Sequence, residues 1–351
     1  MIPIPVLPEE PTLGLPCAFG GPVLDGVLRQ VPEDFVVVEE LGYEASGHGE
    51  HVMLRVRKRG RNTAEVARLL ARHAGVAQVA VGFAGLKDRN ADTTQHFSVQ
   101  LAGREAPDWS LLDDDSLQVL SAVPHHRKVR RGSLRGNRFE IRVTAVRGDT
   151  AQAEDILQRI AREGVPNYFG NQRFGHRGGN LQRFSDMIGG RGRRPGREQR
   201  SLLLSAARSH LFNQVLAARL ADGSWQCAVE GDVLQLEGSQ RQFMHDPADP
   251  SIATRLADLD IHPSGPLCGR SGRALQPVQL AAQREHDVLG PWADWIDALA
   301  RMGVDADRRA LRLVVSELTW TWQEDALVLT FGLPAGGYAT TVLRELLRSA
   351  G

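Results

Sequence analysis

Apolar and polar residues alternate in several short runs of the first 163 residues, and this pattern predicts strands. Val52, Leu54 and Val56 alternate with polar positions in the run 51–57, and the run 138–143 alternates between charged and apolar side chains. A period of two places one face of a strand in the core and the other in solvent. Further runs with strand character are 27–29, 35–39, 79–83, 97–101 and 117–120.

Other segments carry apolar residues at helical spacing. In 63–74 the apolar positions recur every three or four residues, and Asn62 stands where an N-cap residue is expected. The segment 151–163 is amphipathic and is followed by Gly164, a common helix terminator. The remaining predicted helices are 201–220, 291–302 and 339–349.

The middle of the chain differs in composition from both ends. Residues 165–185 are rich in Gly, Asn, Arg and aromatics, 189–197 form a basic Gly/Pro segment, and 222–275 contain short strand-like runs between turns. Strand patterns return at 309–315 and 326–331. This order predicts an α+β fold in which one domain is interrupted by an insertion between about 164 and 312.

The charge of the chain is balanced overall but locally clustered. A total of 42 basic and 42 acidic residues gives a net charge of +0. One basic cluster is usually a solvated surface, but three in a neutral chain suggest a basic face that binds phosphates. The clusters are Arg55, Arg57, Lys58, Arg59 and Arg61; His125 to Arg131 with Arg135, Arg138 and Arg142; and Arg191, Arg193, Arg194, Arg197 and Arg200.

The cysteines and the N-terminus exclude several classes of protein. Cys17, Cys227 and Cys268 have no metal-site or paired spacing, so we expect neither a metal nor a disulfide framework. The N-terminus lacks the features of a signal peptide, and no apolar run approaches membrane-spanning length. We therefore expect a soluble cytoplasmic protein without a membrane partner. It is expected to be a monomer, because no heptad pattern or long apolar helix face is present.

The segment around Asp88 is the strongest candidate for chemistry. It reads FAGLKDRNADTTQ from Phe83 to Gln95, and it joins two strand-like runs. Lys87 and Arg89 flank the carboxylate, and cations keep an attacking carboxylate ionised. The simpler interpretation is a turn aspartate that accepts hydrogen bonds from its own backbone.

Three further segments combine amides, arginines and aromatics. Such mixtures suit RNA bases that have left their stack, because rings stack on bases, amides bind base edges and cations bind phosphates. Phe35 and Asn137 also have plain interpretations, as a core residue and a turn residue. The segments are RQVPEDF at 29–35, LRGNRF at 134–139 and VPNYFGNQRFG at 165–175.

Six blocks of the sequence resemble the TruD family of tRNA pseudouridine synthases, over nearly the whole chain. The resemblance implies a pseudouridine-synthase catalytic domain with a mixed, largely antiparallel sheet, formed by 1–163 and 313–351. An inserted α/β TRUD domain would occupy 164–312. The implied activity converts uridine to pseudouridine at position 13 of tRNA without cofactor or metal. The blocks are PEDFVVVEELG, FAGLKDRNADTTQ, LRGNRF, GVPNYFGNQRFG, SAARSHLFNQVLAARL and FGLPAGGYATTVLREL.

The resemblance also implies roles for individual residues. Asp88 would be the catalytic carboxylate and Arg29 its basic partner. Whether Asp88 attacks the ribose or the uracil, or abstracts a sugar proton, stays open at this point. Tyr338 stands where the family often has Phe. The implied substrate contacts are Phe35, Asn137, Tyr338, Lys87, Asn167, Phe169, Gln172 and Arg173.

Two other functions remain compatible with the sequence. One is a tRNA-binding protein on the same scaffold that has lost catalysis, although Asp88, Arg29 and Asn137 are all present. The other is a hydrolase in which Asp88 acts like the nucleophile of a glycosidase. That reaction needs a second carboxylate as general acid. The nearby candidates are Glu33, Asp34 and Asp92.

Overall fold

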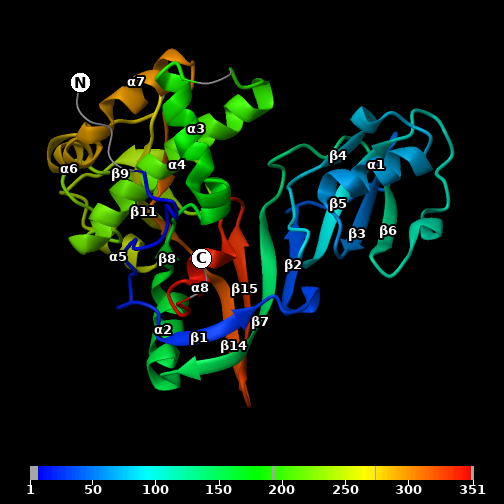
Figure 1. The fold of residues 1–351 in the computed structure, drawn as a ribbon, viewed down its shortest axis with the longest axis horizontal. Coiled ribbons are helices and arrows are strands. Elements are labelled where there is room, and N and C mark those ends of the chain that lie inside the picture. Colours follow the sequence, from blue (N-terminus) through cyan, green and yellow to red (C-terminus); the bar gives the residue numbers. More distant parts are fainter. Residues whose placement is uncertain (1–6, 192–193, 273, 349–351) are drawn as a thin grey trace. The chain divides into compact units, whose positions relative to one another are not determined.

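The computed structural model describes residues 7–191, 194–272 and 274–348. The chain forms two compact units (Figure 1). The sheet unit consists of 24–150 and 315–337, and the helical unit consists of the described parts of 7–23, 151–314 and 338–348. Both units are discontinuous, because the chain leaves each one and returns to it.

The sheet unit is built on one nine-stranded sheet that follows the alternating patterns of the sequence. Strand β1 (Leu24–Leu28) pairs with β7, and β4 (Val81–Phe83) pairs with β5. Of the described pairs in this sheet, β2 with β5 is parallel and the others are antiparallel. The predicted α+β class with a mixed, largely antiparallel sheet is therefore confirmed. The order along the sheet is β14 (Ser316–Gln323), β15 (Ala326–Pro334), β7 (Gly136–Gly148), β2 (Phe35–Glu40), β5 (Asp92–Gln100), β3 (His51–Lys58) and β6 (Leu117–His125).

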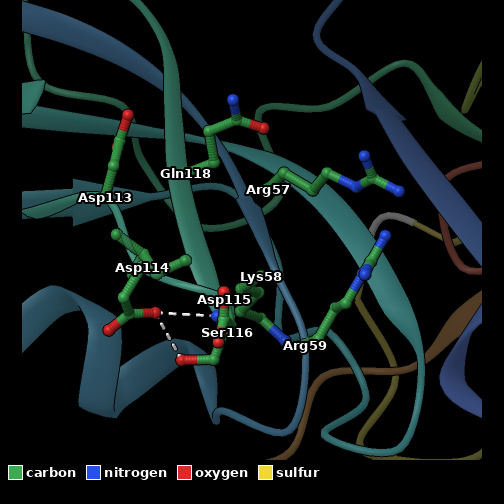
Figure 2. A pocket seen from close by; sticks show the side chains of 9 residues that line it. Arg57, Lys58, Arg59, Asp113, Asp114, Asp115, Ser116 and Gln118 are labelled. Atoms are coloured by element: carbon green, nitrogen blue, oxygen red, sulfur yellow. Dashed lines mark hydrogen bonds between the residues drawn. The ribbon is translucent and has the colours of Figure 1, made fainter.

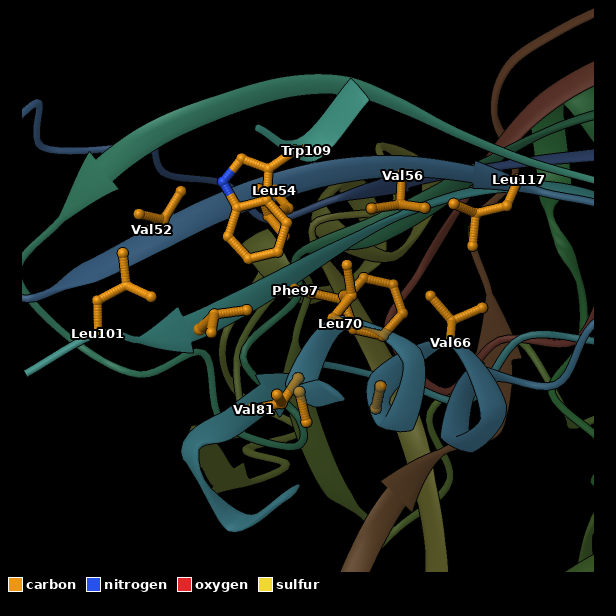
Figure 3. Packing of buried hydrophobic residues seen from close by; sticks show 13 residues of the cluster. Val52, Leu54, Val56, Val66, Leu70, Val81, Phe97, Leu101, Trp109 and Leu117 are labelled. Atoms are coloured by element: carbon orange, nitrogen blue, oxygen red, sulfur yellow. The ribbon is translucent and has the colours of Figure 1, made fainter. Parts of the chain in front are cut away.

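Helix α1 (Thr63–His73) packs against one face of this sheet (Figure 3). Val66 and Leu70 of the helix meet Leu54 and Val56 of β3 and Phe97 of β5, and all five side chains are fully buried. Burying one such side chain stabilises the fold by about 1.5–3 kcal/mol. Val81 of β4 and Val99 of β5 belong to the same core, so the Asp88 segment connects two strands that are packed in it.

The helical unit surrounds a four-stranded sheet with helices. Its strands lie in the order β10 (Gln242–Met244), β9 (Val233–Leu236), β11 (Ile261–Leu267) and β12 (Asp307–Ala310), and β8 (Val165–Pro166) pairs separately with β13 (Arg312–Leu313). The long helix α4 contacts α3, α6, α7 and β11. The helices are α2 (Thr150–Glu163), α3 (Gly179–Ile188), α4 (Arg197–Ala221), α5 (Ser251–Ala257), α6 (Gln279–Leu289), α7 (Ala293–Arg301) and α8 (Ala339–Leu343).

The predicted strand 309–315 is wrong as a single element. It is divided between β12, which pairs with β11, and β13, which pairs with β8. Leu311 lies between them: its amide donates to the carbonyl of Pro263, and its carbonyl accepts from the amide of Asn167. The chain thus changes its partner strand at Leu311, and an apolar run does not encode such a change.

The other differences concern element ends and short elements. Helix α8 ends at Leu343, because the amides of Glu345 and Leu346 bond the carbonyls three residues before them and tighten the turn. The predicted end of that helix at 349 lies outside the described residues. Strand β14 and helices α3, α5 and α6 were not predicted. The three helices bury only two or three residues each, and the two tryptophans of β14 are only partly buried.

The division into a catalytic domain of 1–163 and 313–351 and an inserted domain of 164–312 assigns a function to each part of the chain, and it stays a prediction. The compact units follow different boundaries, since α2 and residues 338–348 group with the helical unit. Within the described parts of the chain, none of the helices has the length and hydropathy that a membrane span requires.

Glu345 fastens the N-terminal segment within the helical unit. Its buried carboxylate accepts a hydrogen bond from the amide of Ala18 at 2.8 Å. Burial raises the pKa of Glu345 to about 7, despite the opposing effects of the Arg344 guanidinium and the amides of Ala18 and Phe19. A raised carboxyl pKa stabilises the fold only while the group is protonated.

We predict that Glu345→Gln removes part of the pH dependence of stability. In the wild type the stabilising proton is fully present below the ordinary pKa of 4.5 and is lost as the pH rises through about 7. Glutamine mimics the protonated acid at every pH, so the variant should gain up to about 3 kcal/mol over the wild type above pH 7. Chemical denaturation at a series of pH values measures this difference. The control is Glu140→Gln on the exposed face of β7, and equal pH profiles for wild type and Glu345→Gln would contradict the prediction.

Candidate active site

Asp88 lies in the irregular segment 84–91 between β4 and β5, which we call the Asp88 loop. Side chains of α1 and β5 bond its backbone. The amide of Lys87 donates to Oγ1 of Thr63 at 3.0 Å, and Nε2 of Gln95 donates to the carbonyl of Gly85 at 3.2 Å. Thr63 and Gln95 are themselves joined by a 2.9 Å hydrogen bond. The first half of the loop is therefore fixed to the core beneath it.

The second half of the loop is fixed to the chain that follows β3. The amide of Gly60 donates to the carbonyl of Arg89 at 3.1 Å, and Nε of Arg89 donates back to the carbonyl of Gly60 at 2.8 Å. Nζ of Lys58 donates to the carbonyl of Asp88 at 3.0 Å. These bonds hold the backbone of the loop and leave the carboxylate of Asp88 at the surface.

The Asp88 carboxylate has one neighbour on each oxygen. Oδ1 accepts from the amide of Asn90 at 3.0 Å, as the simpler interpretation of a turn aspartate expects. Oδ2 lies 3.3 Å from Nη1 of Arg29, and the two side chains are 37% and 33% exposed. A carboxylate that is oriented by a cation and still accessible can react with a bound substrate.

Arg29 holds this position with an unusual backbone. Its φ of 59° falls in the left-handed region, which costs a non-glycine residue about 1 kcal/mol or more. Its guanidinium stacks over the ring of Phe35, with Cζ 4.1 Å from the ring centroid. Phe35 is 4% exposed and also packs edge-on against Phe139 at 6.3 Å. The guanidinium thus lies between a ring and a carboxylate.

Asn137 is the second residue of β7, which lies between two strands at this point, and it is opposite Glu39 of β2 and Leu333 of β15. Its Oδ1 is buried and has no hydrogen-bond partner within the described part of the chain. A buried acceptor without a partner costs about 1–3 kcal/mol. An N–H group of a ligand, such as the one on the uracil ring, would satisfy it.

Lys87 points to a different partner from Asp88. Its Nζ donates to Oε2 of Glu39 at 2.8 Å, and both side chains are largely buried. Burial opposes the charge of Glu39, but hydrogen bonds from His96 together with the charge of Lys87 outweigh it and lower the pKa of Glu39. The ammonium predicted as a substrate contact is thus engaged inside the sheet unit.

The remaining predicted contacts lie in the helical unit and centre on Phe169. The ring of Phe169 packs edge-on against Tyr338 at 6.2 Å, and Nη2 of Arg173 donates to the hydroxyl of Tyr338 at 2.6 Å. Asn167 is 6% exposed, and its Nδ2 donates to the carbonyl of Ala310 at 2.8 Å. Gln172 is exposed. The structure therefore forms two groups: Asp88, Arg29, Phe35, Asn137 and Lys87 in the sheet unit, and Asn167, Phe169, Gln172, Arg173 and Tyr338 in the helical unit.

Each of the three carboxylates considered as a general acid already forms a hydrogen bond or an ion pair. Asp92 is 1% exposed and accepts from Nε of both Arg57 and Arg59 at 2.9 Å. Burial opposes its charge, but these hydrogen bonds outweigh burial and lower the pKa of Asp92. Glu33 pairs with Arg59 at 2.9 Å, and Asp34 accepts from the amide of Val31 at 3.1 Å. A general acid needs the opposite pKa shift from that of Asp92.

A pocket of about 380 Å³ lies at the end of β3 in the sheet unit (Figure 2). Its lining mixes charges of both signs, and in Figure 2 the carboxylate of Asp114 bonds the amide and hydroxyl of Ser116. Neither Asp88 nor Arg29 lines it, so we do not assign it to the candidate site. Nor do the described residues contain a group of His, Cys, Asp and Glu side chains that could hold a metal ion. The lining residues are Arg57, Lys58, Arg59, Asp113, Asp114, Asp115, Ser116, Leu117 and Gln118.

The described residues of the basic clusters at 125–142 and 191–200 lie largely at the surface. The expectation of a basic face is not met by the first cluster, in which Lys58 is buried and Arg57, Arg59 and Arg61 are half-buried and form ion pairs. Arg127 is exposed and stacks over Tyr43, with Cζ 5.1 Å from the ring centroid. In the loop before α4, Arg191 pairs with Asp186 at 3.0 Å, and Arg194 is exposed. Arg193 lies outside the described residues. Surface arginines near stacked rings are typical of RNA-binding faces.

Sequence reasoning missed the residues that hold the Asp88 loop, namely Thr63, Gln95 and Lys58. The first two give no local signal, because their partners are backbone groups distant in sequence. Lys58 does give one: it continues the apolar row Val52, Leu54 and Val56 of β3, where a charged residue is unexpected. A cation in a core-facing row indicates a specific buried partner.

Comparison with known proteins gives consistent matches. A family model for tRNA pseudouridine synthase D (TruD) matches residues 18–188 and 195–346. The tRNA pseudouridine synthase D of Methylococcus capsulatus is 49% identical over 334 residues, which cover 95% of this chain and 94% of that protein. The protein of the same name from Aeromonas salmonicida is 46% identical over 333 residues, covering 94% and 93%.

A solved structure from Methanosarcina mazei, described as a tRNA pseudouridine synthase D (TruD), matches with a TM-score of 0.74. The match covers 97% of this chain and 98% of that one, at 23% sequence identity. At this identity the likeness concerns the fold alone. It confirms the predicted pseudouridine-synthase fold.

We predict that Tyr338→Phe destabilises the helical unit by about 1–2 kcal/mol, because Arg173 loses the hydroxyl that accepts its hydrogen bond. Thermal and chemical denaturation measure the loss. Tyr43→Phe is the control, since the described contacts of Tyr43 are made by its ring with His125 and Arg127. Equal stability losses in the two variants would show that the Arg173–Tyr338 bond contributes nothing specific.

Proposed function

Because this chain belongs to the TruD family and is an isomerase that converts uridine in tRNA to pseudouridine, we propose that Asp88 is its catalytic carboxylate. The proposed target is uridine 13 of tRNA, and the proposed reaction uses no cofactor. The main support for the role of Asp88 is the geometry of its loop. The backbone of the loop is hydrogen-bonded to three other segments, while the carboxylate stays accessible beside Arg29.

The chemistry is compatible with side chains alone. The bond between the ribose and N1 of uracil breaks, the ring turns, and a new bond joins the same ribose carbon to C5. C5 then loses its proton, and N1 gains one. Product and substrate have the same composition, so the reaction needs no external oxidant or reductant. Asp88 can start it by attacking the ribose or the uracil ring, or by removing a sugar proton. The Arg29 cation orients the carboxylate for each of these roles.

The substrate contacts follow from accessibility and unmet hydrogen bonds. We propose that Oδ1 of Asn137 accepts a hydrogen bond from the uracil ring. Phe35 supports the site through Arg29, since the guanidinium covers the ring. Lys87 is bonded inside the sheet unit, and the geometry favours a supporting role for it.

In the helical unit we propose that Tyr338, Phe169, Gln172 and Arg173 contact tRNA. Gln172 is exposed, and Arg173 brings a cation beside two aromatic rings. Asn167 supports this group, because its amide already bonds the backbone of β12.

The hydrogen bonds and ion pairs that Glu33, Asp34 and Asp92 already form argue against a hydrolase. Hydrolysis by the glycosidase route needs a protonated acid beside the leaving group, and the pKa of Asp92 is lowered. Free uracil in the reaction mixture would identify hydrolysis, and its absence is expected.

We also propose a cytoplasmic location and a monomeric state. A tRNA substrate supports the first. The second is supported by the sequence pattern, which shows neither a heptad repeat nor a long apolar helix face.

We predict that Asp88→Asn abolishes pseudouridine formation and leaves tRNA affinity within a few-fold, because the amide keeps the shape of the carboxylate and removes its charge. The assay incubates the purified protein with unmodified tRNA and maps pseudouridine by position. Asp155→Asn on the exposed side of α2 is the matched control. A variant that retains a tenth of the activity would refute the assignment of Asp88.

Charge reversal of Arg191, Arg193 and Arg194 is predicted to weaken tRNA binding and to flatten its dependence on salt. Each lost phosphate contact reduces the slope of log K against log salt by about 0.7–0.9. Binding titrations at several salt concentrations measure the slope. Reversal of Arg68 and Arg72, exposed on α1, is the control. An unchanged slope would make the segment an ordinary solvated surface.

A further inference from the structure

Lys58 is a buried cation on the apolar face of β3. The row Val52, Leu54, Val56 and Lys58 points into one core, and all four side chains are buried. Lys58 is 0% exposed. Removing an ammonium group from water is unfavourable unless strong partners replace the water, so the position demands an explanation.

The partners of Lys58 are two backbone carbonyls, one after β3 and one in the Asp88 loop. Nζ donates to the carbonyl of Arg61 at 2.8 Å and to the carbonyl of Asp88 at 3.0 Å. Among the described residues no carboxylate lies within ion-pair distance of Nζ. The positive charge of Lys58 therefore lies against two backbone carbonyls, and one of them belongs to Asp88.

We propose that Lys58 is a positioning residue for the isomerisation, which holds the backbone of Asp88 and places a positive charge behind the reacting carboxylate. This inference rests on the proposed role of Asp88. Lys58 is covered by protein, so it acts through Asp88 and touches no substrate. A change of its charge alters the orientation and the electrostatic stabilisation of the carboxylate at the same time.

The charge balance around Lys58 supports this role. Burial lowers the pKa of Lys58 to about 8, while the Asp88 carboxylate favours the charged form most among the neighbouring groups. The other groups that face it are Lys87, which lowers the pKa, and Asp92 and Glu65, which raise it. Lys58 therefore carries its charge at neutral pH and loses it in a mildly alkaline range, where the electrostatic support of Asp88 falls.

The test compares Lys58→Met and Lys58→Arg with the wild type. Single-turnover pseudouridine formation is measured at saturating unmodified tRNA from pH 6 to 9.5, and tRNA affinity and thermal stability are measured alongside. Arg104→Met is the matched control, because Arg104 also donates to a backbone carbonyl, that of Gly75, but at the surface and away from Asp88.

The proposal predicts a loss of rate without a loss of binding. Lys58→Met should react about 10- to 100-fold more slowly at pH 7, with tRNA affinity within threefold of the wild type. The wild-type rate should decline above pH 8, and Lys58→Met should lack that decline. Lys58→Arg keeps its charge at higher pH, so it should recover part of the rate and retain it at pH 9.

Two outcomes would overturn the proposal. One is a Lys58→Met protein with the wild-type rate and pH profile. The other is a Lys58→Arg protein that reacts slowly and whose rate still falls above pH 8. That result would assign the fall in rate to another titrating group and would leave Lys58 a purely structural role. The comparison of Lys58→Arg with the wild type decides between these roles even if Lys58→Met does not fold. Failure of the proposed function is separate, because it appears as a tenth or more of the wild-type activity in Asp88→Asn, whatever the result for the Lys58 variants.

Discussion

The Asp88 loop depends on the pairing of its backbone polar groups. Irregular backbone that lies against a core must find hydrogen-bond partners for its amides and carbonyls, since regular pairing with a neighbouring strand is not available to it. Here the partners are the side chains of Thr63, Gln95 and Lys58 and the backbone of Gly60. Together they fix where the chain runs, and the carboxylate of Asp88 projects from a rigid base.

The same requirement explains which parts of the fold could be predicted. Alternation identified β3 and the middle of β7, and strand-like runs identified β2 and the second half of β5. Helical spacing placed α1, α2 and α4 nearly where they lie, because these elements bury one face locally. The break at Leu311 could not be predicted, since it depends on the carbonyl of Pro263 and the amide of Asn167, far away in sequence.

For the candidate site, too, some features could be predicted from the sequence and others could not. Its residue types could be identified from the sequence, because amides, arginines and aromatics are concentrated in a few short segments. Their partners are harder to predict. The family resemblance alone implies that Arg29 is the partner of Asp88, and the structure pairs the two side chains. Nothing in the sequence indicates that Lys87, which flanks Asp88, bonds Glu39, or that Tyr338 meets Arg173 across 165 positions.

The return of β14 and β15 to the sheet has a consequence for synthesis on the ribosome. Strand β15 pairs with β7 along eight residues, from Gly136 to Val143, yet most of the helical unit is translated between these two strands. At about 5–20 residues per second, β7 waits roughly ten seconds or longer with one edge unpaired. An unpaired edge invites association with other chains. The nascent protein is therefore most vulnerable to aggregation after β7 has emerged, and completion of the sheet ends that period.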